Sequence, residues 1–359
     1  MEFKPKIKEF HFWNLKDNYC LKMKDKFMGK ILSKCLHFNM PFYEIANQIG
    51  VGESILRDIK NNPSKKIEIK TLFKILKFLK RNGIRFNLND LETNINWMGN
   101  SFGRGITKPR LPFRIESPKF TALLSSSFGD GTITNISFNS STKYRLGVFE
   151  YSNEEEILRK RLIKSSMKAL GGKPTDYVER ANRNSFSIFF PSIIRDILLL
   201  GGGQRGEKST HNPHIPSVVM NSPDKKIWIK WLQQTVDDEG SVRYRENSNH
   251  EVYITRVVDI TEDFLKQLNP GTKKSFGKFS KKEKEVILKV PSNLLVDELE
   301  LFKRLRIDGK LRPQEIYVTK KGEIKAKWRL YITRKNNIRK FARIIGFRIP
   351  RKQIILRKI

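Results

Sequence analysis

The chain has 359 residues, with 71 Lys and Arg against 37 Asp and Glu, which gives a formal net charge of +34 and a pI near 10.1. A surface adapted to salt or heat would combine lysines with acids in ion-pair networks, so this excess of bases indicates a polyanionic partner, and a nucleic acid fits best. The 38% of hydrophobic residues excludes a disordered polycation, and the length favours two or three domains.

The cysteine content and the hydropathy of the chain indicate in which cellular compartment the protein works. Cys20 and Cys35 are the only cysteines and have no CxxC spacing, and no apolar leader or run is long enough to cross a bilayer. We therefore expect a soluble intracellular protein, in the cytoplasm and associated with the nucleoid. His211 and His214 resemble a pair of metal ligands, but the neighbouring prolines break any helix that would aim them together.

Residues 1–98 are predicted to form a small all-α domain. Residues 1–25 are basic and aromatic without clear periodicity, whereas residues 40–62 have the pattern of two helices joined by a tight turn at Gly50. The apolar positions of this pattern are Ile45, Ala46, Ile49, Val51, Leu56 and Ile59. A basic amphipathic helix follows at 71–81.

This pattern resembles a helix-turn-helix of the phage-repressor type. The residues that would then face DNA are Glu53, Ser54, Arg57 and Lys60. The alternative is a helical bundle without DNA contact. Residues 99–117 are rich in Gly, Pro and Arg, so we interpret them as a linker, through which the domain would add DNA contacts without a catalytic group.

Residues 118–210 and 223–359 are predicted to be an imperfect repeat, with a connection at 211–222. In each copy a helical segment ends in an acid and a glycine before a strand, at Asp130-Gly131 and at Glu239-Gly240. Each copy continues with a second strand (143–151; 251–258), a helix (154–170; 292–305), two strands and a short helix (191–201; 335–346). The acids are 239 − 130 = 109 residues apart, which accommodates one αββαββα unit. Residues 269–284 are interpreted as a surface insertion.

The position of Glu239 is informative by itself. A helix C-terminus already carries partial negative charge on its unpaired carbonyls, so a carboxylate there is unfavourable unless a positive charge shares the site. A divalent cation is the obvious candidate.

Two nine-residue motifs resemble those of the LAGLIDADG homing endonucleases, in the single-chain form that has two motifs. They read LLSSSFGDG at 123–131 and LQQTVDDEG at 232–240. The resemblance covers about residues 118–347, and departs from the family at Phe128, where an acid is often found, and at Gln234, where a small residue is usual. The implied fold is α+β, with two pseudo-symmetric αββαββα repeats forming a DNA-binding saddle, preceded by the small all-α helix-turn-helix domain.

The resemblance implies a Mg²⁺- or Mn²⁺-dependent endonuclease that hydrolyses phosphodiester bonds in both strands of DNA at a long asymmetric site. Asp130 and Glu239, at position eight of each motif, are the implied catalytic residues and metal ligands, with Gly129 and Asp238 in the ligand set. A basic residue should stabilise the transition state, and Lys327 is the candidate because it lies on the predicted groove face. Two motifs in one chain imply a monomer.

The predicted strand at 325–333 alternates apolar residues with basic and polar ones. Its polar face contains Lys325, Lys327, Arg329 and Tyr331. The preceding hairpin adds Arg243 and Arg245, and the first copy offers Lys143, Arg145, Asn135 and Ser187. A two-stranded ribbon with such side chains fits the major groove of double-stranded DNA, where these residues distinguish base pairs.

Two alternatives remain open. A non-cleaving, DNA-binding transcriptional regulator of the same architecture is favoured by Phe128 and Gln234, whereas an acid at both eighth positions favours the nuclease. An RNA maturase that binds its intron is compatible with both charge and motifs. The chain has no recognisable protein-splicing blocks, so we interpret it as a free-standing product and not as an intein. The resemblance also fits an intron-encoded protein, and the sequence leaves the host element open.

Overall fold

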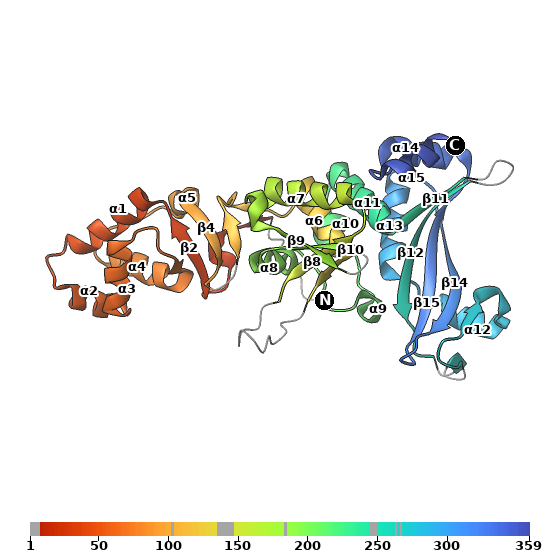
Figure 1. The fold of residues 1–359 in the computed structure, drawn as a ribbon, viewed down its shortest axis with the longest axis horizontal. Helices are drawn as coiled ribbons and strands as arrows, with labels where there is room; N and C mark the ends of the chain where they lie inside the picture. Colours follow the sequence, from red (N-terminus) through yellow and green to blue (C-terminus); the bar gives the residue numbers. More distant parts are fainter. Residues whose placement is uncertain are drawn as a thin grey trace. The chain divides into compact units, whose positions relative to one another are not determined.

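The computed structural model describes residues 8–101, 104–134, 147–182, 185–244, 250–262, 264–265 and 268–359 (Figure 1). The chain divides into two compact units. The first unit consists of Met1–Ile115, Ser166–Val178 and Phe189–Ile197, and the second of Glu116–Ser165, Glu179–Ile188 and Leu198–Ile359. The domain boundaries inferred from the sequence stay a prediction.

The amino-terminal part of the first unit contains a β-sheet as well as helices, so the prediction of an all-α domain is wrong. Its elements are β1 (Glu9–Phe10), η1 (Phe12–Asn14), β2 (Tyr19–Met23), α1 (Asp25–Leu36), α2 (Phe42–Ile49), α3 (Glu53–Asn61), β3 (Ile67–Glu68), α4 (Ile69–Arg81), α5 (Leu88–Thr93), β4 (Ile95–Asn100), β5 (Gly105–Thr107) and β6 (Phe113–Arg114). The sheet has the strand order β3-β2-β4-β5. Four of the five residues of β2 are buried, so this strand lacks the alternation by which a half-buried strand is recognised.

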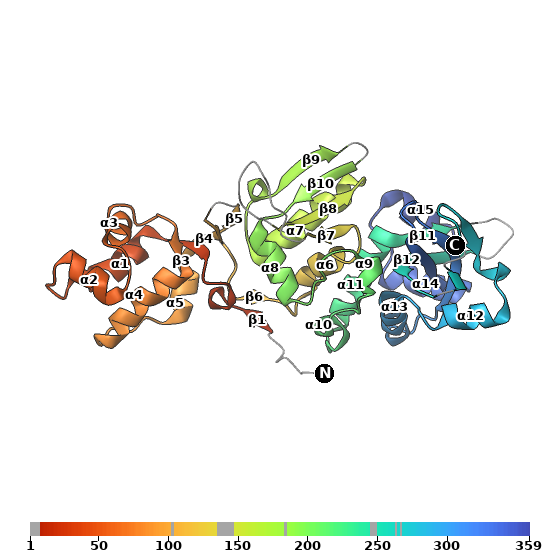
Figure 2. The ribbon, with the colours of Figure 1, turned by 90° about the horizontal axis from the view of Figure 1, so that it is seen from below.

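Helices α2 and α3 have the predicted arrangement of two helices and a tight turn. Gly50 ends α2 in the left-handed conformation, with φ of 74°, which glycine adopts at little cost. Five of the six predicted apolar residues are buried, namely Ile45, Ala46, Ile49, Leu56 and Ile59, whereas Val51 is half-buried. Both α3 and α4 pack against α2 (Figure 2). These contacts explain the hydrophobic pattern, and DNA binding by α3 stays a prediction.

Residues 99–117 are not an irregular linker. β5 pairs with β4, and β6 pairs with β1, in antiparallel registers. Ile106 and Phe113 are fully buried, and the backbone N–H of Thr107 donates to Asp176 Oδ2 at 3.0 Å. The strands are two and three residues long, which is too short for any periodicity to appear between the Gly and Pro residues.

Buried polar contacts join the amino-terminal sheet to α8 (Ser192–Leu200) within the first unit. The hydroxyl of Tyr19 donates to Asp196 Oδ2 at 2.6 Å, and Asn100 Nδ2 donates to Ser192 Oγ at 2.7 Å. Asp196 also accepts from Arg195 Nε at 2.6 Å. Burial, followed by the charge of Asp196, raises the pKa of Tyr19, so its hydroxyl keeps the proton that it donates. The amino-terminal sheet is therefore part of the core of this unit.

We expect Tyr19→Phe to lower the free energy of unfolding by about 1–3 kcal/mol, because it leaves a buried carboxylate with one donor fewer. Chemical denaturation of the whole protein measures this loss. The matched control is Tyr43→Phe, at a position where the side chain is 53% exposed, and there the change should stay within about 0.5 kcal/mol. An equal loss of unfolding free energy for both substitutions would contradict a stabilising role of the hydrogen bond from Tyr19 to Asp196.

From residue 118 on, the predicted order of elements occurs twice. The first copy contains α6 (Pro118–Ser126), β7 (Gly131–Ile133), β8 (Phe149–Asn153), α7 (Glu156–Leu170), β9 (Val178–Asn182), β10 (Ser185–Phe189) and α8. The second contains α11 (Lys225–Glu239), β11 (Gly240–Arg243), β12 (Glu251–Asp259), α13 (Asn293–Arg304), β14 (Lys310–Val318), β15 (Ile324–Ile332) and α14 (Lys335–Ile344). Short helices α9 (Lys208–His211) and α10 (Ser217–Met220) lie between the copies, and α15 (Pro350–Arg357) ends the chain. A pseudo-two-fold relation between the copies stays a prediction.

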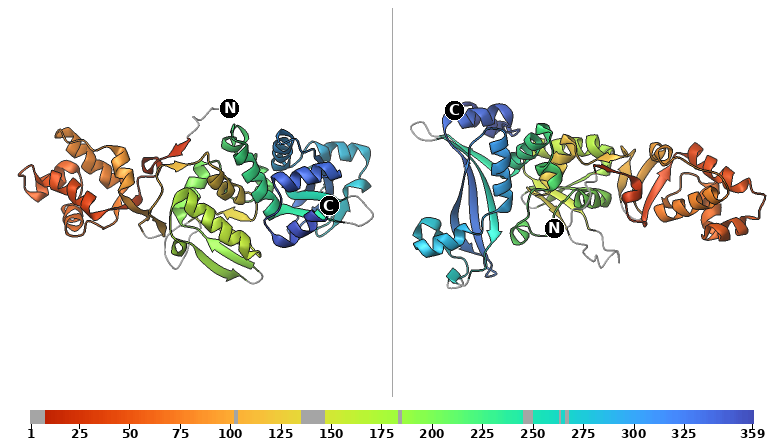
Figure 3. Two further views of the ribbon diagram at one scale, coloured as in Figure 1. Left: turned by 90° about the horizontal axis from the view of Figure 1, so that it is seen from above. Right: turned by 180° about the vertical axis from the view of Figure 1, so that it is seen from behind.

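The sheet of the second copy separates an apolar from a polar face. Its strand order is β11-β12-β15-β14-β13, and β12 alternates between half-buried and buried residues along its whole length. Ile254, Trp328 and Leu330 are buried, and α13 packs against β14 and β15 (Figures 1 and 3). Each such side chain contributes on the order of 2 kcal/mol by burial. The opposite face is left for polar residues, as predicted for β15.

The segment 269–284 adds regular structure to this sheet. β13 (Lys273–Ser275) pairs with β14 at its edge, and η4 (Phe276–Lys278) and α12 (Lys281–Leu288) follow. A capping box between Ser280 and Glu283 begins α12, a local signal that the interpretation as an irregular insertion overlooked. Among all described helices, none combines the length and the apolar composition needed to cross a membrane.

Candidate functional site

The two motifs lie on helices α6 and α11, which pack against each other (Figure 2). The side chains of Ser117 and Asp224 cap the first turns of the two helices. Ser125 Oγ donates to the carbonyl of Trp231 at 3.1 Å and lies 3.3 Å from Thr235 Oγ1. Small hydroxyl side chains therefore let the helices approach closely, which brings the ends of both motifs together.

The motifs are in direct contact at Gly129 and Asp238. A Cβ atom at Gly129 would lie 2.3 Å from Asp238 Oδ2, so only glycine leaves room for this carboxylate. Asp238 Oδ1 accepts hydrogen bonds from the Tyr151 hydroxyl at 2.7 Å and from Gln234 Nε2 at 2.9 Å. Burial, followed by the charge of Asp130, raises the pKa of Asp238 well above its usual range. The interface between the two helices therefore accommodates Gln234, where the family usually has a small residue, because the side chain of Gln234 donates a hydrogen bond to Asp238.

The sixth positions of the motifs have structural partners. Phe128 is buried and its ring lies 5.3 Å from that of Trp231. Asp237 is also buried and forms an ion pair with Arg348, whose backbone N–H donates to Asp237 Oδ1 at 2.7 Å. Neither side chain is therefore free for chemistry.

Asp130 is the last residue of the turn between α6 and β7 and is partly buried. Its Oδ2 accepts a hydrogen bond from Asn153 Nδ2, at the end of β8, at 2.5 Å. Burial and the nearby carboxylate of Glu239 raise the pKa of Asp130 to about 6. The helix α11, in contrast, continues to Glu239 itself. The two acids of position eight are therefore close enough for their charges to interact.

A buried arginine supplies the positive charge that the position of Glu239 requires. Arg256 Nη1 lies 3.5 Å from Glu239 Oε1 and donates to the carbonyl of Phe128 at 2.5 Å, and its Nη2 pairs with Glu298 Oε1 at 2.9 Å. Burial lowers the pKa of Arg256, but Glu298 and Glu239 outweigh it and raise this pKa. Arg256 thus connects Glu239 with the end of the other motif.

Glu239, Arg256 and Lys208 line a common cavity of about 340 Å³. Four residues at the motif ends were not predicted from the sequence: Arg256, Lys208, Asn153 and Lys352. For Asn153 and Arg256 the available signal was a polar residue in the second strand of each copy. Lys208 and Lys352 belong to connecting and terminal segments that carried no signal.

The residues present fit a divalent cation. Asp130 and Glu239 offer hard oxygen ligands, and Mg²⁺ is usually held by one or two carboxylates together with water and phosphate. The buried Asp238 Oδ2, which has no hydrogen-bond partner among the described residues, is a further carboxyl oxygen nearby. In the described part of the chain, no cluster of three or more acidic, His or Cys side chains has metal-binding geometry. A metal at this site would therefore depend on Asp130 and Glu239.

Lys327 does not pair with Asp130 or Glu239 among the described residues. It forms an ion pair with Glu315 on the neighbouring strand at 3.1 Å, and no contact of the described residues joins it to Asp130 or Glu239. Its catalytic role stays a prediction, and Lys208 and Arg256 lie nearer to the acids.

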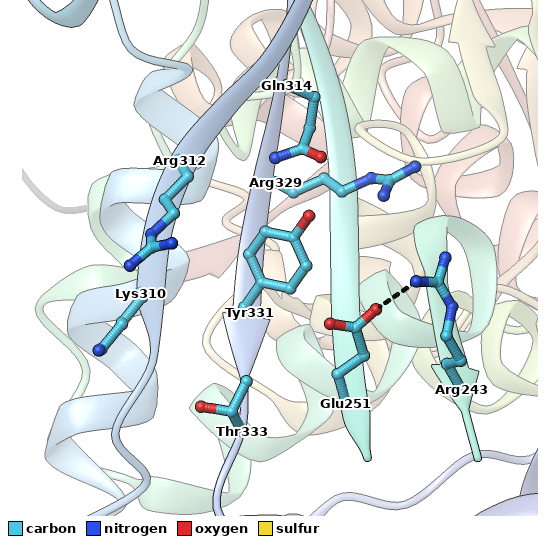
Figure 4. Close-up of a pocket in the computed structure, with 8 residues that line it drawn as sticks. All are labelled: Arg243, Glu251, Lys310, Arg312, Gln314, Arg329, Tyr331 and Thr333. Atoms are coloured by element: carbon cyan, nitrogen blue, oxygen red, sulfur yellow. Dashed lines mark ion pairs between the residues drawn. The ribbon is translucent and has the colours of Figure 1, made fainter. Parts of the chain in front are cut away.

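The polar face of the second sheet forms a basic groove of about 420 Å³ (Figure 4). It is lined by Arg243, Glu251, Lys310, Arg312, Gln314, Arg329, Tyr331 and Thr333. Opposite partners across β14 and β15 are Arg312 with Arg329 and Lys310 with Tyr331. Arg243 pairs with Glu251 at 2.9 Å. Three of the predicted contacts, Arg243, Arg329 and Tyr331, thus lie in one groove, to which β14 adds bases that the sequence analysis did not single out.

Lys325 does not belong to this groove. It is buried, and its Nζ pairs with Glu207 at 2.5 Å and with Asp259 at 3.2 Å. These acids raise the pKa of Lys325 although burial alone would lower it. The prediction that Lys325 faces DNA is wrong, because acids distant in the sequence enclose it. Ser187 is likewise buried and contacts Ser152 Oγ at 2.6 Å.

The remaining predicted DNA contacts are on α3 or outside the described residues. Arg57 is exposed and pairs with Glu53 at 2.5 Å, and Lys60 lies over the ring of Phe42 at 5.6 Å. Lys143, Arg145, Asn135 and Arg245 lie outside the described residues. His211 and His214 are not brought together as a ligand pair: His214 Nδ1 lies 3.0 Å from Asp297 Oδ2.

No model of a protein family matches the sequence, and no protein of curated function matches it. Among solved structures, the chain is similar to I-DmoI in complex with DNA and Mn, with 9% identity over 64% of this chain and 97% of that chain and a TM-score of 0.35. It is similar to the homing endonuclease I-WcaI bound to its DNA recognition sequence, with 15% identity over 67% and 85% of the chains and a TM-score of 0.34. It is also similar to the N-terminal LAGLIDADG domain of DUF199/WhiA, with 13% identity over 68% and 89% and a TM-score of 0.33.

We expect Asp130→Asn to stabilise the metal-free protein near pH 7.5. In the folded wild type, the raised pKa keeps the proton on Asp130 up to about pH 6, whereas the unfolded chain loses it near 3.8. The stability of the wild type should therefore fall as the pH rises through this window, by about 3 kcal/mol at most. Urea denaturation at several pH values in EDTA tests this. A variant that is less stable than the wild type at every pH would contradict the assignment.

Proposed function

We propose that the protein is a site-specific double-strand DNA endonuclease of the LAGLIDADG type, which hydrolyses phosphodiester bonds with a divalent metal at a long asymmetric site. The observation that carries the proposal is the pairing of Asp130 with Glu239 at the ends of two packed helices. A protein that only binds DNA gains nothing from carboxylates directed at phosphates. A basic groove on the second sheet supplies the complementary surface for a polyanion.

Mg²⁺ or Mn²⁺ would be held by Asp130 and Glu239. When bound, such a metal lowers the pKa of the attacking water and stabilises the leaving oxygen. The side chains around it act on the two acids: Asn153 orients Asp130 by its hydrogen bond, and Arg256 orients Glu239. Arg256 and Lys208, which face the same cavity as Glu239, also offer positive charge to a phosphate there.

DNA recognition is assigned to the basic groove. Arg312, Gln314 and Arg329 are residues that read base edges in the major groove, which admits a two-stranded ribbon. Because one chain contains both motifs, the enzyme would act as a monomer, and its affinity should fall steeply with salt as phosphates are contacted. Helices α2 and α3 would extend the contact through Arg57 and Lys60.

A non-cleaving regulator is the second candidate. It is favoured by the partners that both acids already have without metal, namely Asn153 for Asp130 and Arg256 for Glu239. In such a protein these acids would serve only to fix the helix ends. Cleavage assays decide between the two functions.

We expect Glu239→Gln to lower Mg²⁺-dependent cleavage by roughly 100-fold or more, because it removes a charge that would hold the metal. DNA affinity in Ca²⁺ should persist, since the groove is unchanged and Arg256 keeps Glu298 as partner. Plasmid cleavage and gel shifts, on a site selected from a randomised library, measure both quantities, and Asp130→Asn should behave alike. A wild type that binds this site tightly yet neither nicks nor cuts it with Mg²⁺ or Mn²⁺ would leave the regulator as the function.

We expect Arg312→Ala to weaken binding to the selected site by about 1–3 kcal/mol and to relax the base preference at one position, as for a base contact in the groove. The control is Arg339→Ala, which removes the same charge from an exposed position on α14. Gel shifts against site variants compare the two proteins. The groove assignment fails if both substitutions weaken all sites equally.

A further inference from the structure

The second copy contains a segment that has no counterpart in the first. Between β8 and α7 of the first copy lie only Glu154 and Glu155, whereas residues 260–292 separate β12 from α13 in the second. Part of this segment folds as β13, η4 and α12, beside the end of β14 (Figure 1). We call residues 273–289 the basic insertion, because they contain seven lysines and two glutamates. The element order that both copies share does not account for it.

The basic insertion is anchored by contacts of its own. Phe279 and Ile287 are buried. Lys274 Nζ lies 4.1 Å from the centroid of the Phe279 ring, and Lys284 Nζ donates to the carbonyl of Gly277 at 2.9 Å. Two of the seven lysines thus hold the insertion together. The insertion therefore has a defined conformation beside the sheet.

The other five lysines of the basic insertion are exposed. They are Lys273, Lys278, Lys281, Lys282 and Lys289. Acids near this end of the sheet pair with lysines of β15 instead: Glu315 pairs with Lys327 at 3.1 Å, and three further acids lie 2.5–3.5 Å from Lys325 Nζ, namely Glu207, Asp259 and Glu323. Among the described residues, no acid forms an ion pair with the five exposed lysines. Their charge is therefore available to a partner.

The strand register places the basic insertion at the edge of the polar face. Lys273 of β13 lies opposite Tyr317 of β14, which lies opposite Lys325 of β15. Directly opposite residues of an antiparallel sheet have their side chains on the same face, and residues two apart on a strand share a face. Lys325 therefore shares its face with Arg329 and Tyr331, which line the basic groove. Lys273 extends this polar face beyond β14.

The distance from the groove to the basic insertion is about half a turn of duplex DNA. Arg312 in the groove and Tyr317 beside the insertion are five residues apart (317 − 312) on β14, or about 16 Å at the rise of a strand. Each strand of B-DNA advances about 3.4 Å per base pair. A duplex whose major groove follows the ribbon would thus reach the insertion roughly five base pairs beyond the bases at Arg312.

We propose that the basic insertion binds the phosphate backbone of the duplex that flanks the recognised site, and that it adds affinity without reading the base sequence. A lysine ammonium group is a compact point charge that suits a phosphate, whereas base recognition favours the planar fork of arginine. The contact lies on one side of the site only, because one copy has the insertion. This inference rests on the proposed binding of DNA by the basic groove, which positions the duplex.

The test compares two triple variants of the full-length protein that lose the same charge. The insertion variant removes exposed lysines from η4 and from the first turn of α12: Lys278→Gln, Lys281→Gln and Lys282→Gln. The control variant removes exposed lysines from the first turn of α11, at the end opposite to Glu239, and from α13, on the apolar side of the sheet: Lys225→Gln, Lys226→Gln and Lys303→Gln. The two variants thus differ in the location of the lost charges.

Gel shifts in Ca²⁺ on a long duplex with the selected site at its centre measure affinity over a range of salt. The insertion variant should bind roughly 10-fold more weakly at about 0.1 M salt, and the slope of log K against log salt should flatten by about 2–3 as phosphate contacts are lost. Its base preference should stay that of the wild type. The control variant should lose less than about 2-fold. Equal losses in both variants would overturn the proposal, because the effect would then be one of net charge.

The length of the duplex separates a flanking contact from a contact inside the site. On a duplex trimmed to the bases that the groove recognises, the wild type and the insertion variant should bind equally. On the long duplex, the hydroxyl-radical footprint of the wild type should extend roughly five base pairs further on one side than that of the insertion variant. Footprints of equal length would overturn the proposal.

Three further measurements exclude other roles of the lysines. Arginine at the same three positions keeps the charge and should restore both the salt slope and the footprint. The Tm of the insertion variant should stay within about 2 °C of the wild type, and a larger fall would assign the lysines to packing. A loss of affinity for a structured RNA, with an unchanged DNA footprint, would assign the surface to RNA and overturn the proposal.

The readouts keep this inference apart from the nuclease proposal, since none of them uses cleavage. A wild type that binds the site without cutting it removes the nuclease activity alone. An insertion variant with the wild-type footprint and salt slope removes the flanking contact alone.

Discussion

The close packing of α6 against α11 is the constraint on which the rest of the site depends. Ser125 and Thr235 meet across the interface, and Gly129 leaves room for the carboxylate of Asp238. The same proximity places Asp130 and Glu239 within reach of each other's charge. Burial, followed by the charge of Glu239, raises the pKa of Asp130, because a carboxylate that is partly removed from water and close to another is unfavourable.

Different neighbouring groups stabilise the two acids. Asp130 receives a neutral amide from Asn153, whereas Glu239 lies beside the guanidinium of Arg256. Arg256 also pairs with the fully buried Glu298, so removing either acid would leave the arginine less compensated in a buried position. The two halves of the site are thus chemically unequal.

The sheet of the second copy contributes one face to the hydrophobic core and the other face to the protein surface. Alternation along β12 and β15 sends apolar side chains toward the helices and leaves Arg329 and Tyr331 on the opposite face. β14 contributes Arg312 beside Arg329 through its register. The exception is Lys325 at the start of β15, where Glu207 and Asp259 enclose the ammonium group and convert a surface position into a buried ion pair.

Local patterns in the sequence determined the order of elements, the end of the second motif helix at Glu239, the turn at Gly50 and the alternation of β15, because each depends on residues within one or two turns or strands. The first motif helix ends at Ser126, before the predicted end at Asp130. Tertiary structure alone decided the partners of the charges. Arg256 meets a carbonyl 128 positions away, and the partner of Lys325 at Glu207 is 118 positions away. Tertiary structure also decided the strands β2, β5 and β6, which are too short or too fully buried to show a period. Periodicity records which side of an element is apolar, whereas the neighbour of a buried charge depends on how distant segments pack.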